Sequence, residues 1–194
     1  MTIAKPTPAD PPRGGRKKVS VMTALAAAGL AATLATKSEL RKHYPYYDVA
    51  GILTVCEGLT GSWIVKGKYY SDAECSKRTT EYIQQMSSRM TKCGVGPLTD
   101  ESWKAWGHFT YNIGTPSFCA STAAKLLRQK KYNEACDQML RWDVLTIKGK
   151  KIHCSIPENR KGANRVNGCD GIMNRREMEY AECKAAAKFE YTAR

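Results

Sequence analysis

The pattern of hydrophobic and polar positions divides the chain into a short apolar stretch near the N-terminus and a longer soluble part. Residues 19–36 form a run of 18 residues without a charge. As a helix this run would measure about 27 Å, close to the roughly 30 Å hydrocarbon core of a bilayer. Seven of the 18 residues are alanine and only six are strongly apolar. The pattern therefore predicts a transmembrane helix that is only weakly held in lipid.

The flanks of this run predict its orientation. Residues 1–18 are rich in proline and glycine and carry five basic residues against one acid, which is typical of a disordered cationic tail. Positive charge on this side predicts that the N-terminus stays in the cytoplasm. Residues 37–194 would then be exported as a soluble domain.

The composition of residues 19–36 leaves several interpretations open. Small residues permit cleavage of a signal peptide near Ala35. A permanent anchor would be richer in leucine, isoleucine and phenylalanine. An alanine-rich soluble helix would need a polar face, which this run lacks. A helix that inserts into the membrane and later leaves it fits the composition best.

The soluble part has the pattern of an α+β protein, with a small antiparallel sheet lobe followed by a larger helical lobe. Glycine-punctuated apolar runs at 52–56 and 63–65 predict the sheet within residues 45–71. A helix over 72–92 should be capped by Ser71 or Asp72, and another should open at Thr99. The remaining helical stretches are expected at 118–129, 131–142 and 171–189.

Eight cysteines, all in the exported part, predict up to four disulfides made in an oxidising compartment. A disulfide between Cys154 and Cys169 would close residues 146–170, a basic segment that we expect to be a polar loop. The other pairings cannot be deduced from spacing. Three histidines and no CxxC pair argue against a metal site.

The net charge of +13 favours a polyanionic neighbour, which could be nucleic acid, an anionic membrane surface or a cell-wall polymer. Export and the lack of a recognisable binding motif argue against nucleic acid. The charge therefore points to the membrane and the wall.

Candidate chemistry lies at the start of the soluble part. Glycoside hydrolysis needs one carboxylic acid to protonate the leaving oxygen and a second group to direct water or attack the sugar. Glu39 is followed after eight residues by Asp48, and Asp48 after five more by Thr54. This spacing alone is moderately specific.

The spacing resembles the Glu-x8-Asp-x5-Thr catalytic triad of the phage-type lysozymes, glycoside hydrolase family 24. Further motifs similar to family features follow in the family's order: YDVAGILTVC at 47–56, FTYNIG at 109–114, Ser121-Thr122 opening a helix, and GIMNRRE at 171–177. Together they cover roughly residues 39–183, essentially the whole soluble part. The ordered set is much more specific than the triad alone.

The resemblance implies a role for each position. Glu39 would be the general acid with a raised pKa, Asp48 the ionised group that activates water or stabilises the transition state, and Thr54 the group that orients the water. The family precedent also implies inversion at the anomeric carbon. Substrate contacts would come from the helical lobe, at Tyr111, Asn112, Arg175 and Arg176. The expected substrate is peptidoglycan; we expect a monomer without cofactor or metal.

Two departures from the family pattern are visible. Leu40 follows Glu39 where the family often has glycine, and a Gly-His pair is missing after Thr54. The missing histidine removes a structural ion pair, and Glu57 adds an acid near the cleft. No aspartate follows Glu57 at the required spacing, so we expect Glu57 to be a surface acid rather than the catalytic one.

Only two residues separate the weak membrane segment from Glu39, which would place Glu39 within about 10 Å of the bilayer. One stretch would then either lie in lipid or pack beside the cleft, as a bistable switch element requires. This arrangement resembles the signal-anchor-release endolysins of phages of Gram-negative bacteria. It implies transient tethering to the inner membrane, release to the periplasm and host lysis. Residues 19–36 contain no cysteine, which argues against thiol-driven release.

Two other functions remain open from the sequence. A lytic transglycosylase needs the acid but no water-activating aspartate. A catalytically inactive cationic wall-binding protein could keep the same fold, although loss of Glu39, Asp48 or Thr54 would be its signature and all three are present.

Overall fold

The fold was analysed in a computed structural model of the chain. It describes residues 17–37, 41–48, 51–147, 149–160, 166 and 168–193. The predicted cationic tail therefore lies almost wholly outside the described residues.

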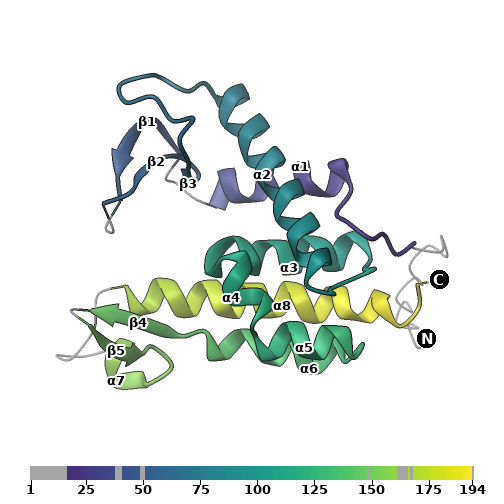
Figure 1. Ribbon diagram of the computed structural model, residues 1–194. Coiled ribbons are helices and arrows are strands. Elements are labelled where there is room, and N and C mark those ends of the chain that lie inside the picture. Colours follow the sequence, from purple (N-terminus) through teal and green to yellow (C-terminus); the bar gives the residue numbers. More distant parts are fainter. Residues whose placement is uncertain are drawn as a thin grey trace, which may run out of the picture.

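A small sheet and a larger group of helices make up the described protein, with helix α2 running between them (Figure 1). The helices follow in the order α1 (Ala24–Lys37), α2 (Asp72–Lys92), α3 (Asp100–Ile113), α4 (Thr115–Cys119), α5 (Thr122–Arg128), α6 (Tyr132–Asp137), a 3-10 turn (Met139–Arg141), α7 (Pro157–Arg160) and α8 (Cys169–Glu190). The expected α+β architecture is confirmed.

The sheet lobe is an antiparallel meander with strand order β1-β2-β3. The strands are β1 (Lys42–Tyr47), β2 (Leu53–Cys56) and β3 (Leu59–Thr60). Tyr46 pairs with Thr54, and Lys42 pairs with Cys56 across an irregularity in the register. The run 63–65, expected to be a strand, instead lies in turns that lead into α2.

Local capping chemistry explains where the two central helices begin. Ser71 accepts the Glu74 N–H, and the Glu74 side chain accepts the Ser71 N–H, which makes a capping box at the start of α2. Thr99 accepts the Ser102 N–H at the start of α3. Both predicted helix starts are confirmed.

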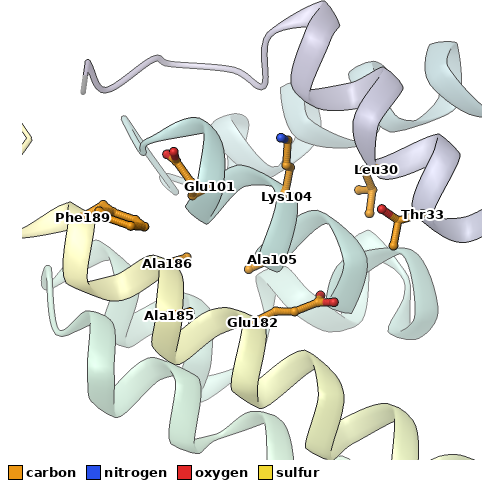
Figure 2. Close-up of a pocket in the computed structure, with 9 residues that line it drawn as sticks. All are labelled: Leu30, Thr33, Glu101, Lys104, Ala105, Glu182, Ala185, Ala186 and Phe189. Carbon is orange, nitrogen blue, oxygen red and sulfur yellow. The ribbon is translucent and has the colours of Figure 1, made fainter. Parts of the chain in front are cut away.

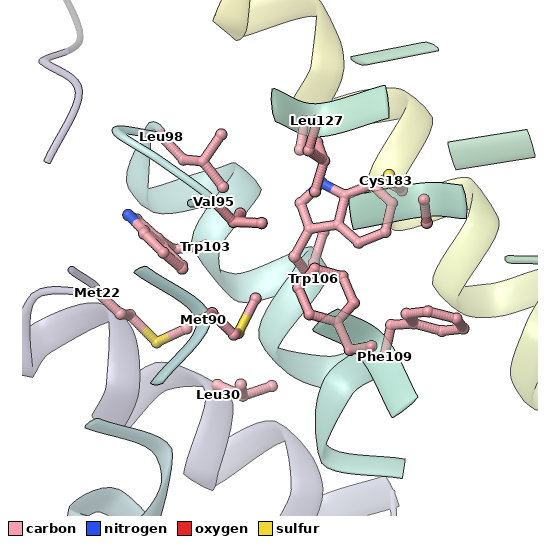
Figure 3. Packing of buried hydrophobic residues seen from close by; sticks show 14 of the residues in the cluster. Met22, Leu30, Met90, Val95, Leu98, Trp103, Trp106, Phe109, Leu127 and Cys183 are labelled. Carbon is pink, nitrogen blue, oxygen red and sulfur yellow. The ribbon is translucent and has the colours of Figure 1, made fainter. Parts of the chain in front are cut away.

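The main hydrophobic core lies in the helical lobe, and α1 is part of it (Figure 3). Met22 and Leu30, each 3% exposed, pack among buried side chains of α2 and α3 such as Met90 and Trp106. A Cβ on Gly107 of α3 would lie 2.7 Å from Met22 Cε and 2.9 Å from Leu30 Cδ2. Glycine at 107 therefore lets α1 approach α3 closely.

Four disulfides use all eight cysteines: Cys56–Cys75, Cys93–Cys119, Cys136–Cys183 and Cys154–Cys169. The pairing suggested for Cys154 and Cys169 is present. The first bond joins the sheet to α2, and the third joins α6 to α8, so covalent links tie the main elements of both lobes.

The helical lobe differs from expectation in its connecting segments. The expected helices 118–129 and 131–142 are each broken, because short helices and turns replace continuous ones. The expected polar loop contains a hairpin, β4 (Val144–Ile147) with β5 (Lys150–His153), and α7. Buried Asp143 accepts the Ser155 N–H and pairs with His153, which fixes the base of this hairpin.

The weak membrane segment is not a single helix in this structure. Residues 19–23 precede α1, whose first turn is capped by the Thr23 hydroxyl accepting the Ala26 N–H. Within the described part of the chain, no helix is both long enough and apolar enough to cross a membrane.

Candidate active site

The hairpin between β1 and β2 places two of the three predicted catalytic residues together. Asp48 directly follows β1, and its carboxylate Oδ1 accepts the Ile52 N–H at 2.9 Å. The Thr54 hydroxyl on β2 donates to the Ile52 carbonyl at 2.9 Å. Both functional side chains are thus oriented by the peptide groups of one residue.

Burial differs between the two side chains in a way that suits the predicted chemistry. Thr54 is 3% exposed, so its hydroxyl is held in one position by the surrounding sheet. Asp48 is only partly buried, so solvent can reach its carboxylate. A carboxylate beside a fixed hydroxyl can hold and deprotonate a water molecule.

Glu39, the predicted general acid, lies outside the described residues. The chain places it between two described parts, two residues after the end of α1 at Lys37 and two residues before Arg41. Its role stays a prediction, as do the roles of Asp48 and Thr54.

Glu57, expected to be a surface acid, is buried, with its side chain 1% exposed. The guanidinium of Arg41 pairs with Glu57 Oε1, and the Thr79 hydroxyl of α2 donates to Glu57 Oε2 at 2.7 Å. The expectation was wrong because the register that pairs Lys42 with Cys56 brings the next two positions, Arg41 and Glu57, opposite each other.

Arg41 and Glu57 together connect the sheet to two helices. Arg41 Nη1 donates to Asp72 Oδ1 at 2.6 Å, and this bond holds the pKa of the Asp72 carboxyl below its ordinary value. The Glu57 carbonyl accepts the Tyr111 hydroxyl of α3 at 3.1 Å. An internal ion pair therefore occupies the region where the family histidine is missing.

The helical-lobe residues predicted to contact sugar make well-defined internal contacts. Tyr111 packs edge-on against Tyr82 of α2, and burial raises the pKa of its phenol. The Asn112 amide donates to the His108 carbonyl at 3.1 Å and to Glu179 Oε1 at 2.7 Å. These contacts fix both side chains, and their predicted roles in substrate binding remain untested.

The two adjacent arginines of α8 lie in different surroundings. Arg176 is 4% exposed, pairs with Glu179 at 2.6 Å and stacks over Phe109. Arg175 is exposed. Of the two, only Arg175 presents its side chain to solvent, where a substrate could reach it.

No group of His, Cys, Asp and Glu residues suited to holding a metal ion occurs among the described residues.

A sheet lobe that carries an Asp–Thr pair on a hairpin, joined through a long helix to a helical lobe, defines a lysozyme-like α+β protein. The solved endolysin of the Escherichia coli O157:H7 phage FAHEc1 is similar, with a TM-score of 0.62 and 22% identity, over 81% of this chain and 90% of that one.

The phage lysozyme family model matches residues 36–179, and the chain belongs to that family of glycoside hydrolases. The SAR-endolysin of Bacteriophage PS119 is 30% identical over 142 residues, 73% of this chain and 74% of the relative. The SAR-endolysin of Escherichia phage Mu is 34% identical over 139 residues, 72% of this chain and 70% of the relative. The expected resemblance is confirmed, and the chain is a lysozyme of the endolysin type.

Side-chain contacts between distant segments of the chain were not predicted from the sequence. A signal for the Arg41–Glu57 pair existed, since an added acid and a base stood at positions that a hairpin would bring together. No comparable signal indicated that Asn112 would bind Glu179, or that Lys18 would reach the C-terminal end of α8.

Proposed function

We propose that this protein cleaves the β-1,4 bond between N-acetylmuramic acid and N-acetylglucosamine in peptidoglycan and thereby lyses the host cell. The observation that carries the proposal is the hairpin on which Asp48 and Thr54 converge on Ile52. Membership of the phage lysozyme family supports it. We further propose that the enzyme acts as a monomer without a cofactor.

In this proposal three side chains divide the reaction. Glu39 donates its proton to the glycosidic oxygen as the bond to the anomeric carbon breaks. Asp48 accepts a proton from the attacking water, and Thr54 orients that water through its hydroxyl oxygen. The bond from the Ile52 N–H fixes the orientation of the Asp48 carboxylate, so little reorganisation is needed during the reaction.

Substitution of the acid tests the proposal. Glu39→Gln and Asp48→Asn should each lower the rate of peptidoglycan solubilisation by about 100-fold or more, because each removes a proton-transfer group. Glu134→Gln, which changes an exposed glutamate on α6, should keep full activity. Wild-type activity in Glu39→Gln would overturn the site assignment, and products with anhydro-muramic ends would identify a lytic transglycosylase instead.

We also propose that residues 19–36 first hold the protein in the inner membrane and then leave it, so that the enzyme becomes active in the periplasm. The names of the relatives from PS119 and Mu, SAR-endolysins, support this. So does the weak apolar character of the segment, since alanine gains little from lipid.

The packing of α1 supports two mutually exclusive states, one in the membrane and one in the core of the helical lobe. One face of the segment is buried in the helical lobe, through Met22, Ala26, Ala27, Leu30, Ala31 and Leu34. Those side chains would all face lipid in a transmembrane helix, so they cannot serve both states at once. Because Glu39 follows α1 closely, seating α1 in the core also fixes one end of the peptide that carries the acid.

A further inference from the structure

The segment just before α1 lies across the ends of three helices and is held there by main-chain bonds. Val19 and Leu98 exchange two backbone hydrogen bonds, at 2.7 and 3.1 Å. The Trp103 indole N–H donates to the Val19 carbonyl at 2.8 Å, and the Thr91 hydroxyl donates to the Ser20 carbonyl at 2.6 Å. The helical lobe thus offers a specific site for residues 18–20.

A buried carboxylate lies at the centre of this site. Glu190, at the end of α8, is 2% exposed, and its side chain is fully buried. Its Oε1 accepts the Thr99 N–H at 2.6 Å and the Thr99 hydroxyl at 2.8 Å. Its Oε2 lies 3.3 Å from Lys18 Nζ, and no other cation pairs with it in the part of the chain that the structure describes.

Lys18 is well placed to be this counter-ion. Its ammonium donates to the Tyr132 hydroxyl at 3.3 Å and lies over the Tyr132 ring. Burial alone would lower the pKa of Lys18, but the contacts with Tyr132 and Glu190 outweigh it and raise the pKa above its ordinary value. Lys18 therefore stays charged beside the buried carboxylate at any physiological pH.

The ion pair also joins the N-terminal segment to the C-terminal end of α8. Further along, a cavity of about 320 Å³ separates α1 from α8, lined by Leu30, Thr33, Lys104, Glu182, Ala186 and Phe189 among others (Figure 2). α1 packs mainly on α2 and α3. The contact between Lys18 and Glu190 is thus a direct polar link from this segment to α8.

We propose that Lys18 and Glu190 form a latch that holds the released protein in its active conformation. The proposal rests on the tethering and release proposed above. While residues 19–36 span the membrane, Lys18 lies on the cytoplasmic side and Glu190 on the periplasmic side. Glu190 then lacks this counter-ion beside its bonds to Thr99, which costs free energy. Docking of Lys18 after release removes that penalty and opposes return to the membrane.

The latch gives Lys18 two successive roles. In the membrane it is one of the positive charges that orient the segment. In the released protein it neutralises Glu190. Lys17 is the natural comparison, since it carries the same flanking charge but is exposed.

Matched substitutions separate these roles. Lys17→Met and Lys18→Met remove the same flanking charge and should alter membrane orientation equally. In the purified released protein, hydrogen exchange at the Val19 and Leu98 amides should become about tenfold faster in Lys18→Met and stay unchanged in Lys17→Met. Lys18→Arg should restore protection.

Glu190→Gln tests the other side of the latch without changing the flank. It should speed exchange at the same two amides, and adding Lys18→Met to it should cause little further change, because the two residues act together. Lys18→Met keeps the measurement possible if Glu190→Gln does not fold, since Lys18 is partly exposed.

Two results would overturn the latch: wild-type protection of Val19 and Leu98 in Lys18→Met, or equal loss of protection in Lys17→Met. Neither result depends on whether the protein is ever tethered, because exchange is measured on the released form. Failure of tethering itself would appear separately, as wild-type protein that never associates with membranes.

Discussion

The regions on the two sides of Glu39 are attached to the helical lobe in different ways. After Glu39, the β1–β2 hairpin is fixed by the Cys56–Cys75 disulfide and by the pair between Arg41 and Glu57. Before Glu39, α1 is held by apolar packing, a two-bond bridge and the Lys18 latch, without a covalent link among the described residues.

This difference indicates which side can move. The hairpin that carries Asp48 and Thr54 stays in place on its own internal contacts. α1 can leave without breaking a covalent bond, and its buried face is rich in alanine, so its seating is only moderately favourable. In the proposed function, Glu39 therefore lies between a hairpin held by a disulfide and a helix that has no covalent link among the described residues.

The largest effect should come from removing the covalent attachment of the hairpin. The double substitution Cys56→Ser with Cys75→Ser opens a loop of 19 residues and should lower the free energy of unfolding by about 3 kcal/mol. Activity should fall too, measured as peptidoglycan solubilisation. Cys154→Ser with Cys169→Ser, which opens a loop of 15 residues away from the hairpin, should cost similar stability with a smaller loss of activity. Equal activity losses would contradict the special role of the hairpin attachment.

Replacing single leucines of α1 by alanine should distinguish packing in the protein core from contact with lipid. Leu30→Ala should lower the stability of the released protein by about 3 kcal/mol, because Leu30 is 3% exposed and its loss leaves a cavity. Leu25→Ala should leave that stability nearly unchanged, because Leu25 is 84% exposed. Both should weaken membrane association equally. Chemical unfolding and membrane flotation measure the two quantities; equal stability losses would mean that α1 is not seated as described.

The buried pair between Arg41 and Glu57 should contribute more to the free energy of unfolding than the exposed pair between Arg41 and Asp72. Glu57→Gln removes the buried partner of Arg41 and should lower the free energy of unfolding by about 2 kcal/mol. Asp72→Asn removes the exposed partner of the same guanidinium and should have a much smaller effect. Urea unfolding of the two variants gives the comparison, and the reverse order would show that Glu57 is not the dominant partner.

The smallest effect on stability should come from Glu74, in the first turn of α2. Lys68 and the Ser71 N–H lower the pKa of Glu74 to about 2, below its value in the unfolded chain. Stability from Glu74 is therefore present above about pH 4.5 and is lost as the pH falls through about 2. Glu74→Gln should lower the Tm at pH 7, with the difference from wild type disappearing near pH 2. A difference that persists at pH 2 would rule out this linkage.

Local sequence signals predicted the parts of the fold that depend on neighbouring residues. The caps at Ser71 and Thr99 lie within three residues of their partners, so both helix starts could be predicted. The likeness of residues 47–56 to the family's hairpin predicted that Asp48 and Thr54 lie on one hairpin. The β4–β5 hairpin was missed because neither VLTI in β4 nor KKIH in β5 shows the alternation that marks a half-buried strand.

Contacts between distant segments could not be predicted. Glu57 was expected at the surface. It is buried because it contacts Arg41 and Thr79 of α2, and both partners are distant from it in the sequence. The apolar run at 19–36 predicted either lipid contact or packing beside the cleft, and the structure shows one face of it in the core of the helical lobe. A weakly apolar, alanine-rich helix is compatible with both environments, and its sequence alone does not choose between them.

In the proposed function, the enzyme is active only when α1 has left the membrane and packs in the helical lobe. The direct measurement compares peptidoglycan cleavage by the full chain tethered in energised membrane vesicles with cleavage by the same chain after the membrane potential is collapsed. We expect little cleavage before collapse and full activity afterwards, with release into the soluble fraction. Equal cleavage by the tethered and released forms would contradict it.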